Sequence, residues 1–453
     1  MEKNFPIKNI ESKKEKRNYF FHLAWPAAAE GILIHLLSSI DLIMAGSLGS
    51  QAQAAIGIIS QPKMMTLLFV RAFATALTAV ISRRYGEKNS REMNAIFKQS
   101  LVVTAIFYFI LIGLCLAIFP NILGLAGAQK DYWDSAYTYG TIIFIGLFFN
   151  AIAMIINASL VAVGQTRVIF VANVAGNIVN CLLNYCFIFG AFGFPRLGIL
   201  GIGIGTLTGN ILSLFISAKA VANEKIPLSF KEGEWMPKRE KFTSILKVLQ
   251  GSLPEQFFER LGMFLYTVMV AHLGLIYMAV HHIAMNLCDV LYSMAIGLGT
   301  ATAATTGQML GKKSPEEAYD YGKIGERFGL LVAGIGFCLF FFFRQDIVSL
   351  FSKDPQVIEI GSKIMIIVAV VSFPQTLSLV HSGVLKGAGD TKYVAHYSFL
   401  IIAIMRPLLT YILLFKLDLG LTGAWMALLC DQSLRALAAT RRFYSKKWQK
   451  VHL

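Results

Sequence analysis

The feature that most constrains this chain is a series of long apolar runs. Its 453 residues contain stretches of about 20 or more mostly apolar residues, the length that a helix needs to cross a bilayer. Only 15% of the residues are charged, against about 25% in a soluble domain. We therefore predict an all-α polytopic membrane protein with twelve spanning helices, near residues 20–44, 53–81, 95–119, 135–163, 168–191, 197–221, 245–271, 279–308, 322–343, 357–383, 394–415 and 419–440.

The net charge of +15 is explained by where the basic residues lie. Lysines and arginines crowd both tails and alternate connections, whereas the connections 46–53 and 273–278 contain none. Basic loops stay on the cytoplasmic side of a membrane. We therefore expect a protein of the cell membrane whose termini and central loop are cytoplasmic. No basic face with interleaved aromatic residues occurs, so nucleic acid is not an expected partner.

Several other functional classes are disfavoured by what the sequence lacks. It shows no converging set of nucleophile, base and orienting residue, and no Walker A motif, so we expect neither an enzyme nor an ATP-driven pump. No small-residue cleavage site follows the first run, so we expect that helix to be retained. The cysteines lie in apolar runs without CxxC spacing and are interpreted as small core residues: Cys115, Cys181, Cys186, Cys288, Cys338 and Cys430.

The chain repeats itself at an offset of 225 residues. Leu48-Gly49 corresponds to Leu273-Gly274, Gly164-Gln-Thr166 to Gly389-Asp-Thr391, and Glu30 to Glu255. Each half then contains six helices, and an even number gives the halves parallel topology. Such repeats are typical of transporters, with the substrate site between or within the halves. We place a tail at 1–19, a first lobe at 20–222, a cytoplasmic loop at 223–244, a second lobe at 245–440 and a basic tail at 441–453.

Four glycines follow apolar runs at positions where a helix ends. A glycine can adopt the left-handed conformation that closes a helix, because it has no Cβ. We expect this conformation at Gly86, Gly164, Gly311 and Gly389. None of them opens a helix after a strand, so a phosphate-binding role is not predicted.

Short motifs occur in a fixed order along both halves. They are Ile40–Gly49 (IDLIMAGSLG), Ala162–Thr166 (AVGQT), Leu183–Gly190 (LNYCFIFG), Glu255-Gln256, Thr306–Gly311 (TGQMLG) and Leu385–Thr391 (LKGAGDT). Together they resemble the multidrug and toxic compound extrusion (MATE) transporters over essentially the whole chain. The resemblance implies two six-helix lobes, V-shaped about a central cavity. It also implies export of organic, often cationic and aromatic compounds in exchange for H⁺ or Na⁺, with no other cofactor.

Two carboxylates interrupt the first run. An ionisable group inside the hydrocarbon costs about 2.5–3.5 kcal/mol on insertion scales, so it is a functional candidate by default. Asp41 and Glu30 are eleven residues apart and fall on nearly the same helix face. Such a carboxylate can take up and release a proton, or bind Na⁺ together with carbonyl oxygens.

The fifth run carries asparagines spaced four, three and four apart, at 173, 177, 180 and 184, which form one stripe on a helix. By resemblance, Asn180 and Asn184 join the first-helix aspartate in an ion-linked site, and Asn157 and Thr206 match the same cluster. Many family members have aspartate where this chain has Asn184, which removes one charge here. The alternative is that the stripe forms contacts between helices, worth about 0.6 kcal/mol each.

Glu255, Glu259, Asp289 and Gln375 are the candidates in the second lobe. By resemblance, Glu259 matches an acidic position that binds a cation in one bacterial branch of the family. That branch also has an aspartate where this chain has Gln375. Alternatively, Glu255 and Glu259 could pair with Arg260, and Asp289 could face a basic side chain.

Lys63 and Arg71 are unusual intramembrane cations in the second run. They could be structural, or they could make a cavity that admits zwitterionic or anionic cargo. Arg406, and the Asp431/Arg435 pair one helical turn apart, are interpreted as structural. Our leading hypothesis is a monomeric secondary antiporter for small molecules in the lipid bilayer. The alternative is a flippase for lipid-linked oligosaccharides or an exporter of one dedicated metabolite.

Overall fold

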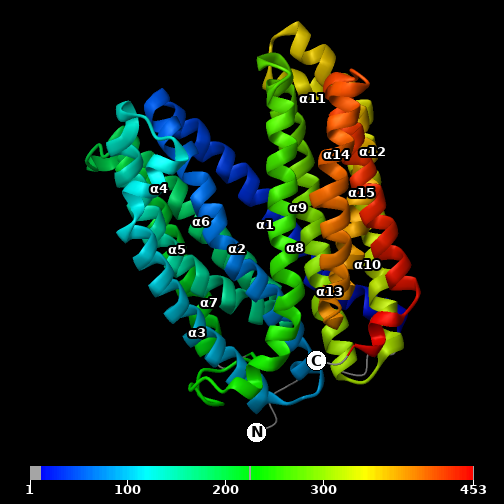
Figure 1. The fold of residues 1–453 in the computed structure, drawn as a ribbon. Helices are drawn as coiled ribbons and strands as arrows, with labels where there is room; N and C mark the ends of the chain where they lie inside the picture. The colour runs from blue at the N-terminus through cyan, green and yellow to red at the C-terminus, as the bar shows by residue number, and fades with distance from the viewer. Residues whose placement is uncertain (1–11, 224–225, 452–453) are drawn as a thin grey trace. The chain divides into compact units, whose positions relative to one another are not determined.

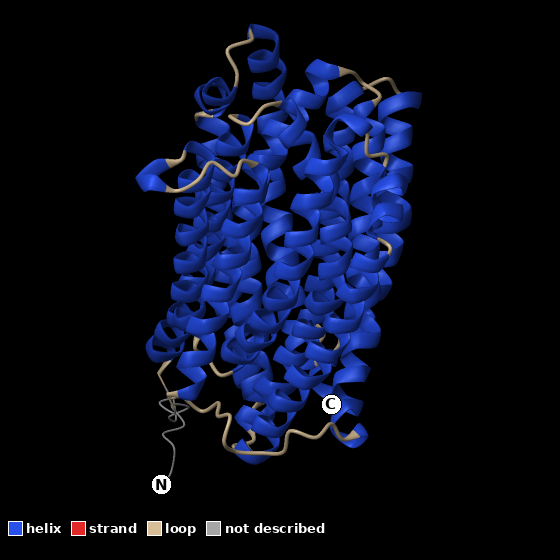
Figure 2. Cartoon of the chain, turned by 90° about the vertical axis from the view of Figure 1, so that its left-hand side faces the viewer, coloured by secondary structure: helices blue, strands red, loops and turns tan. Residues whose placement is uncertain are grey.

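The computed structural model describes residues 12–223 and 226–451. Helix runs through almost all of these residues, and they contain no β-strand (Figure 2). Each of the twelve predicted runs lies in a helix. The predicted all-α class is therefore confirmed.

The helices of the two halves follow one another with short connections (Figure 1). The first half contains α1 (Lys13–Gly46), α2 (Ser50–Gly86), α3 (Ser90–Ala117), α4 (Phe119–Ala126), η1 (Lys130–Tyr132), α5 (Trp133–Ala162), α6 (Thr166–Phe189), η2 (Ala191–Gly193) and α7 (Ile199–Ala222). The second half contains α8 (Arg239–Ala271), α9 (Leu275–Gly311), α10 (Pro315–Phe342), α11 (Arg344–Phe351), α12 (Pro355–Ala388), α13 (Thr391–Ser398), the π-helical η3 (Phe399–Met405), α14 (Arg406–Tyr411), the π-helical η4 (Ile412–Lys416), α15 (Gly420–Tyr444) and η5 (Lys447–Lys450).

Not all of the predicted runs are equally apolar. Among the described residues, ten helical segments are long and apolar enough to cross a membrane. The other two runs form α8 and α15, which are long enough but carry internal charges: Glu255, Glu259 and Arg260 in α8, and Asp431 and Arg435 in α15. Charges inside a spanning helix are costly unless they find partners, so these two helices depend on contacts with their neighbours.

The chain divides into two compact units, which are described separately. The first contains residues 32–243, and the second contains residues 12–31 together with 244–451. We expected residues 20–31 in the first lobe, because the only long polar segment lies near 219–247. Instead, Phe20 stacks on Phe328 with ring centroids 5.8 Å apart. At Gly31 a Cβ would lie 2.7 Å from Ser293 Cβ, so glycine permits the close approach of α1 to α9.

The predicted repeat is visible in the backbone of the two halves. At the same offset of 225, α2 and α9 both have 37 residues, α3 and α10 both have 28, and α4 and α11 both have 8. Gly49 and Gly274, which precede α2 and α9, have φ values of 91° and 100°. The halves therefore share one structural plan, as predicted.

The left-handed helix ends occur where predicted in two of four cases. Gly164 and Gly389 have φ values of 81° and 86°, which confirms the prediction for them. Gly86 and Gly311 are instead the last residues of α2 and α9, and the left-handed residues are Lys88 and Lys313, at φ 57° and 59°. The prediction was wrong there because each helix runs on to its glycine, and the turn closes two residues later.

All four of these ends have the same hydrogen bonds. Lys88 N donates to Tyr85 O and Asn89 N donates to Arg84 O, and the three other ends repeat this pattern. It is the Schellman arrangement, which satisfies carbonyl groups left over at a helix C-terminus. The geometry of the turn therefore determines which position is left-handed. That position holds glycine at two of the four helix ends and lysine at the other two.

The non-helical segment that precedes α8 is held against α3. The buried Lys98 donates to the backbone oxygens of Phe230 and Gly233 at 3.3 and 2.5 Å, and Asn94 Oδ1 accepts from Ser229 N at 2.9 Å. Helix α8 begins at Arg239, so the connection is somewhat shorter than the predicted loop at 223–244.

Candidate functional site

The first unit contains a cavity of about 580 Å³ bordered by α1, α2, α5, α6 and α7. This volume is ordinary for a small-molecule pocket. The charged residues in its lining are Asp41, Lys63 and Arg71. The uncharged polar lining consists of amides and hydroxyls: Tyr139, Asn150, Asn157, Asn173, Asn177, Asn180, Thr206, Asn210 and Ser213.

Asp41 reaches the cavity from α1 and is tied to α6. The Nδ2 group of Asn184 donates to Asp41 Oδ1 at 3.0 Å. Asn184 is buried, and its Oδ1 atom has no hydrogen-bond partner. The structure therefore brings together the first-helix carboxylate and the fifth-run amide that the sequence singled out.

The asparagine stripe of α6 faces α7 and the cavity. Ser213 donates to Asn173 Oδ1 at 2.6 Å, and Asn180 donates to Thr206 Oγ1 at 3.2 Å. Asn177 bonds back to the carbonyl of Asn173 at 2.8 Å. The stripe thus joins α6 to α7, and three of its asparagines also line the cavity.

Close packing at one crossing lets these amides meet α7. A Cβ on Gly176 of α6 would lie 2.6 Å from Gly209 O, and a Cβ on Gly209 of α7 would lie 2.6 Å from Gly176 O. Only glycine fits at both positions. The two backbones therefore touch directly, and both glycines are part of the cavity lining.

Helix α5 adds polar groups that include residues missed in the sequence. Asn157 lines the cavity, and its Oδ1 accepts a hydrogen bond from Ser217 of α7 at 2.8 Å. Asn150 donates to Asn210 Oδ1 at 3.4 Å, and neither residue was singled out from the sequence. The available signal was an amide within an apolar run, which is as costly to bury in these helices as in α6.

Lys63 and Arg71 both project into the cavity from α2. They are eight residues apart, so they lie about 12 Å apart along the helix axis. Lys63 interacts electrostatically with both Asp41 and Arg71. Both residues are only partly buried, which is consistent with charged groups that face a polar space.

Glu30 does not lie in this cavity. It belongs to the second unit, while Asp41 belongs to the first. A shared helix face was a weak guide because the boundary between the two units falls between Gly31 and Ile32, within the same helix.

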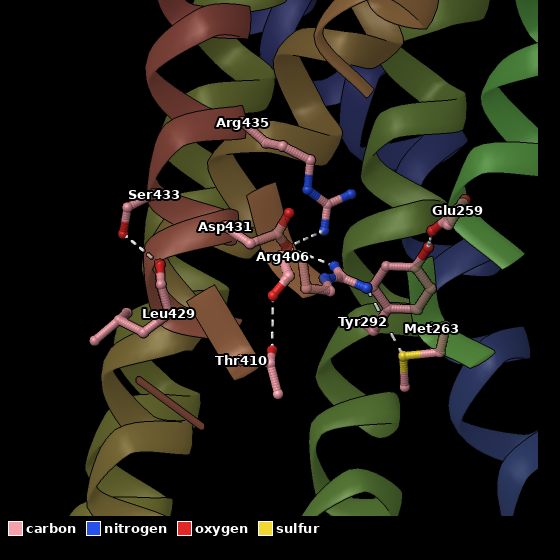
Figure 3. A network of polar contacts seen from close by, with 9 residues as sticks. All are labelled: Glu259, Met263, Tyr292, Arg406, Thr410, Leu429, Asp431, Ser433 and Arg435. Atoms are coloured by element: carbon pink, nitrogen blue, oxygen red, sulfur yellow. Dashed lines mark hydrogen bonds and ion pairs between the residues drawn. The ribbon is translucent and has the colours of Figure 1, made fainter. Parts of the chain in front are cut away.

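The second unit holds a network of buried charges (Figure 3). Asp431 Oδ2 accepts from Arg406 at 2.5 Å and from Arg435 at 3.3 Å. Tyr292 donates to Glu259 Oε1 at 2.8 Å. Arg406 lies between the π-helical segments η3 and η4. The structural interpretation of these residues from the sequence fits, and the network also takes in Arg406, which the sequence did not connect to the pair.

The other candidates of the second unit also have partners. Glu255 pairs with Lys386 at 2.6 Å, not with Arg260. Gln375 is buried and accepts from Cys288 Sγ at 3.6 Å. Asp289 is partly buried and does not figure in the network of Figure 3. Glu255 of α8 is thus paired with α12, and Glu259 of α8 is bonded to α9.

Comparison with known protein families agrees with this architecture. The MatE family model matches residues 26–186 and again 252–412. The chain belongs to the MatE family. The two matches also coincide with the two halves of the repeat.

Relatives of the chain in this family span nearly its whole length. It is 26% identical to the Thermotoga maritima protein named "Probable multidrug resistance protein NorM", over 97% of this chain and 95% of that one. It is 25% identical to "Multidrug resistance protein MdtK" of Yersinia pseudotuberculosis, over 83% of each chain. A solved outward-facing multidrug resistance MATE family transporter of the MOP superfamily matches with a TM-score of 0.88 and 19% identity, covering 95% of this chain and 97% of that one.

These comparisons confirm the resemblance to MATE transporters and the two-lobe fold. The chain is therefore a multi-pass membrane transporter that resides in a lipid bilayer and has small molecules as substrates. This is a family of transporters, not of enzymes.

Proposed function

We propose that this protein is a secondary antiporter that exports organic compounds from the cell in exchange for H⁺ or Na⁺. The observation that carries the proposal is the Asp41–Asn184 hydrogen bond beside the 580 Å³ cavity of the first unit. The multidrug resistance names of its relatives support drugs as cargo. We further propose a monomer in the cell membrane, with both termini cytoplasmic.

The Asn184 amide suits a carboxylate that alternately binds and releases a proton or Na⁺. Its NH₂ group donates to an ionised Asp41, as observed at 3.0 Å. If Asp41 binds a proton, its new O–H needs an acceptor, and the unbonded Oδ1 of Asn184 can provide one when the amide turns over. With Na⁺, the same oxygen and the carboxylate are suitable ligands. An amide at position 184 therefore serves both states without adding a second negative charge.

Coupling requires that the ion prefers one conformation of the transporter. A change of charge at Asp41 alters its bond to α6, which in turn bonds α7 through Asn180 and Thr206. An ion that binds one conformation more tightly shifts the population toward it. We propose that this chain of contacts links ion binding to alternating access, and that Asn157 stabilises the same cluster.

The test is gradient-driven efflux from proteoliposomes that contain the purified full chain. Asp41→Asn keeps the shape of the side chain and removes its titration, so we expect loss of efflux driven by a pH or Na⁺ gradient. Asp320→Asn is the matched control, because its carboxylate is exposed at the protein surface. Normal gradient-driven rates from a folded Asp41→Asn protein would overturn the assignment.

A second candidate function is favoured by Lys63 and Arg71. Cations in the cavity suit a flippase for lipid-linked oligosaccharides or an exporter of one dedicated metabolite, since such cargo often carries negative charge. Drug accumulation in cells that overproduce the protein separates the candidates. Reduced accumulation of several unrelated drugs supports the multidrug antiporter, and unchanged accumulation supports the dedicated exporter.

A further inference from the structure

We infer that Lys63 and Arg71 form a binding site for the anionic group of an organic cargo in the first-unit cavity. The inference rests on the proposed function in one respect, namely that this cavity holds cargo. It adds the charge of the cargo and the residues that recognise it. The site would take an aromatic or aliphatic molecule bearing a sulfonate, carboxylate or phosphate group.

The charge of the lining is the first argument. Two cations and one carboxylate face the same space, so the described lining has a formal charge of +1 even when Asp41 is ionised. Asp41 is engaged by the Asn184 amide. A cationic cargo would therefore enter a cavity whose charge opposes it, whereas an anion would be attracted.

The second argument is the position of the two cations. Lys63 and Arg71 both line a cavity large enough for a ligand. Their ammonium and guanidinium groups offer several donors each, and guanidinium suits oxyanions in particular.

The surrounding groups can complete such a site. Asn150, Asn177 and Asn210 supply amides on three different helices, and Ile143, Leu147 and Met154 supply apolar surface. A ring system can therefore lie against the apolar wall while its anionic group lies toward α2. Because the two cations are about 12 Å apart along α2, a cargo can interact with either or extend between them.

Three probes that share one ring system test the inference by direct binding. We would measure dissociation constants calorimetrically for 2-naphthalenesulfonate, the neutral 2-naphthalenesulfonamide and trimethyl(2-naphthyl)ammonium, using the full chain in nanodiscs and empty nanodiscs as blank. We expect the sulfonate to bind at least about tenfold more tightly than the other two, since removal of water strengthens charge interactions in a cavity. Tighter binding of the ammonium probe would overturn the inference.

Variants then locate the site. Lys63→Gln and Arg71→Gln should each weaken sulfonate binding about tenfold or more, and Lys63→Arg should retain it because the charge is kept. Lys363→Gln is the control, because it removes a positive charge from an exposed surface pair. Sulfonate binding that is unchanged in folded Lys63→Gln and Arg71→Gln proteins would contradict the assignment.

The binding assay is independent of the flux assay proposed above. If Asp41→Asn still shows gradient-driven efflux while sulfonate binding depends on Lys63, the antiport mechanism fails and the anion site stands. If Asp41→Asn loses efflux while sulfonate binding is unchanged by substitution of Lys63 and Arg71, the antiport mechanism stands and the anion site fails.

Discussion

The two units place polar residues at equivalent positions of the repeat but use them in different ways. In the first unit, the cavity is lined by Ile34, Lys63, Leu67, Asn150, Thr206 and Asn210. At the offset of 225, the same positions hold Glu259, Cys288, Tyr292, Gln375, Asp431 and Arg435. These six bond to one another in three pairs, Glu259 with Tyr292, Cys288 with Gln375, and Asp431 with Arg435.

The difference shows how one template can give a structural centre or a binding site. In the second unit the side chains at these positions reach one another and bond in pairs. In the first unit the same positions hold Lys63, two apolar residues and three uncharged polar residues, and these side chains border a space of about 580 Å³. Equivalent positions of one template therefore give a bonded network of charges in one unit and the lining of a cavity in the other.

The largest expected effect comes from breaking the network of the second unit. Asp431→Ala removes the shared carboxylate and leaves Arg406 and Arg435 buried beside each other. Removing one partner of a buried ion pair typically costs about 3–5 kcal/mol. Unfolding of the purified protein in detergent would measure the loss. Asp320→Ala, which breaks an exposed pair with Lys16, should cost less than about 1 kcal/mol, and equal losses for both would contradict a structural role for the network.

The next effect concerns pH and belongs to the cavity alone. Protonation of Asp41 changes the formal charge of the described lining from +1 to +2. The sulfonate probe should therefore bind more tightly as pH falls from 8 to 5.5, by up to about tenfold, and the ammonium probe more weakly. The other titratable groups that interact with Asp41 are Lys63, Tyr139 and Cys181, and Arg71 lines the same cavity.

The control for this pH effect is Asp41→Asn, which should bind the sulfonate equally at both pH values. A pH dependence that survives in the variant would place the responsible group elsewhere. The sign also bears on coupling. A cationic cargo and a proton compete for Asp41, so binding of one displaces the other. An anionic cargo and a proton instead favour each other's binding. Exchange of an anion for a proton would therefore have to arise from the change in conformation.

A smaller effect is expected in the turns, where the two units agree. Lys88 and Lys313 occupy left-handed positions that cost an L-residue about 1–2 kcal/mol relative to the usual helical region. Lys88→Gly and Lys313→Gly should each stabilise the protein by about 0.5–1 kcal/mol, after the entropy cost of glycine. Gly164→Ala and Gly389→Ala should destabilise it by about 1 kcal/mol. Chemical unfolding measures the change in stability for all four variants. Changes of opposite sign at positions 88 and 313, or at positions 164 and 389, would contradict the shared plan.

Periodicity and length predicted the fold well, because spanning helices need long apolar runs and little else. The repeat followed from residue identities in the loops, and the equal lengths of α2 and α9 confirm it. The exchange of residues 12–31 into the second unit was not predictable in this way. It depends on close packing at Gly31. The hydrophobicity of a run does not specify which other helix it will pack against.

The site was predictable in part. Asp41 and the stripe on α6 were found because carboxylates and regularly spaced amides are rare in such runs, and the structure joins Asp41 to Asn184. Asn150 and Asn210 were missed because single amides on two different helices form no pattern until they face each other. Glu30 and Asp41 share a helix face in sequence but belong to different units. Spacing along a helix thus predicts which residues share a helix face, but it does not predict which cavity or unit that face contacts.

The smallest expected effect is that of Lys63→Met, which we compare with the same substitution at Lys386 in the second unit. Lys63→Met and Lys386→Met remove the same charge from spanning helices. Lys386 lies 2.6 Å from the buried Glu255, so its loss leaves that carboxylate uncompensated and should cost about 3 kcal/mol or more. Lys63 faces the cavity, and the hydrogen bond from Asn184 to Asp41 does not depend on it, so its loss should change stability by about 0.5 kcal/mol or less. Thermal unfolding of the two variants side by side decides the matter. If Lys63→Met costs as much as Lys386→Met, then Lys63 is part of a structural network, and the cavity of the first unit is no more a binding site than its counterpart in the second.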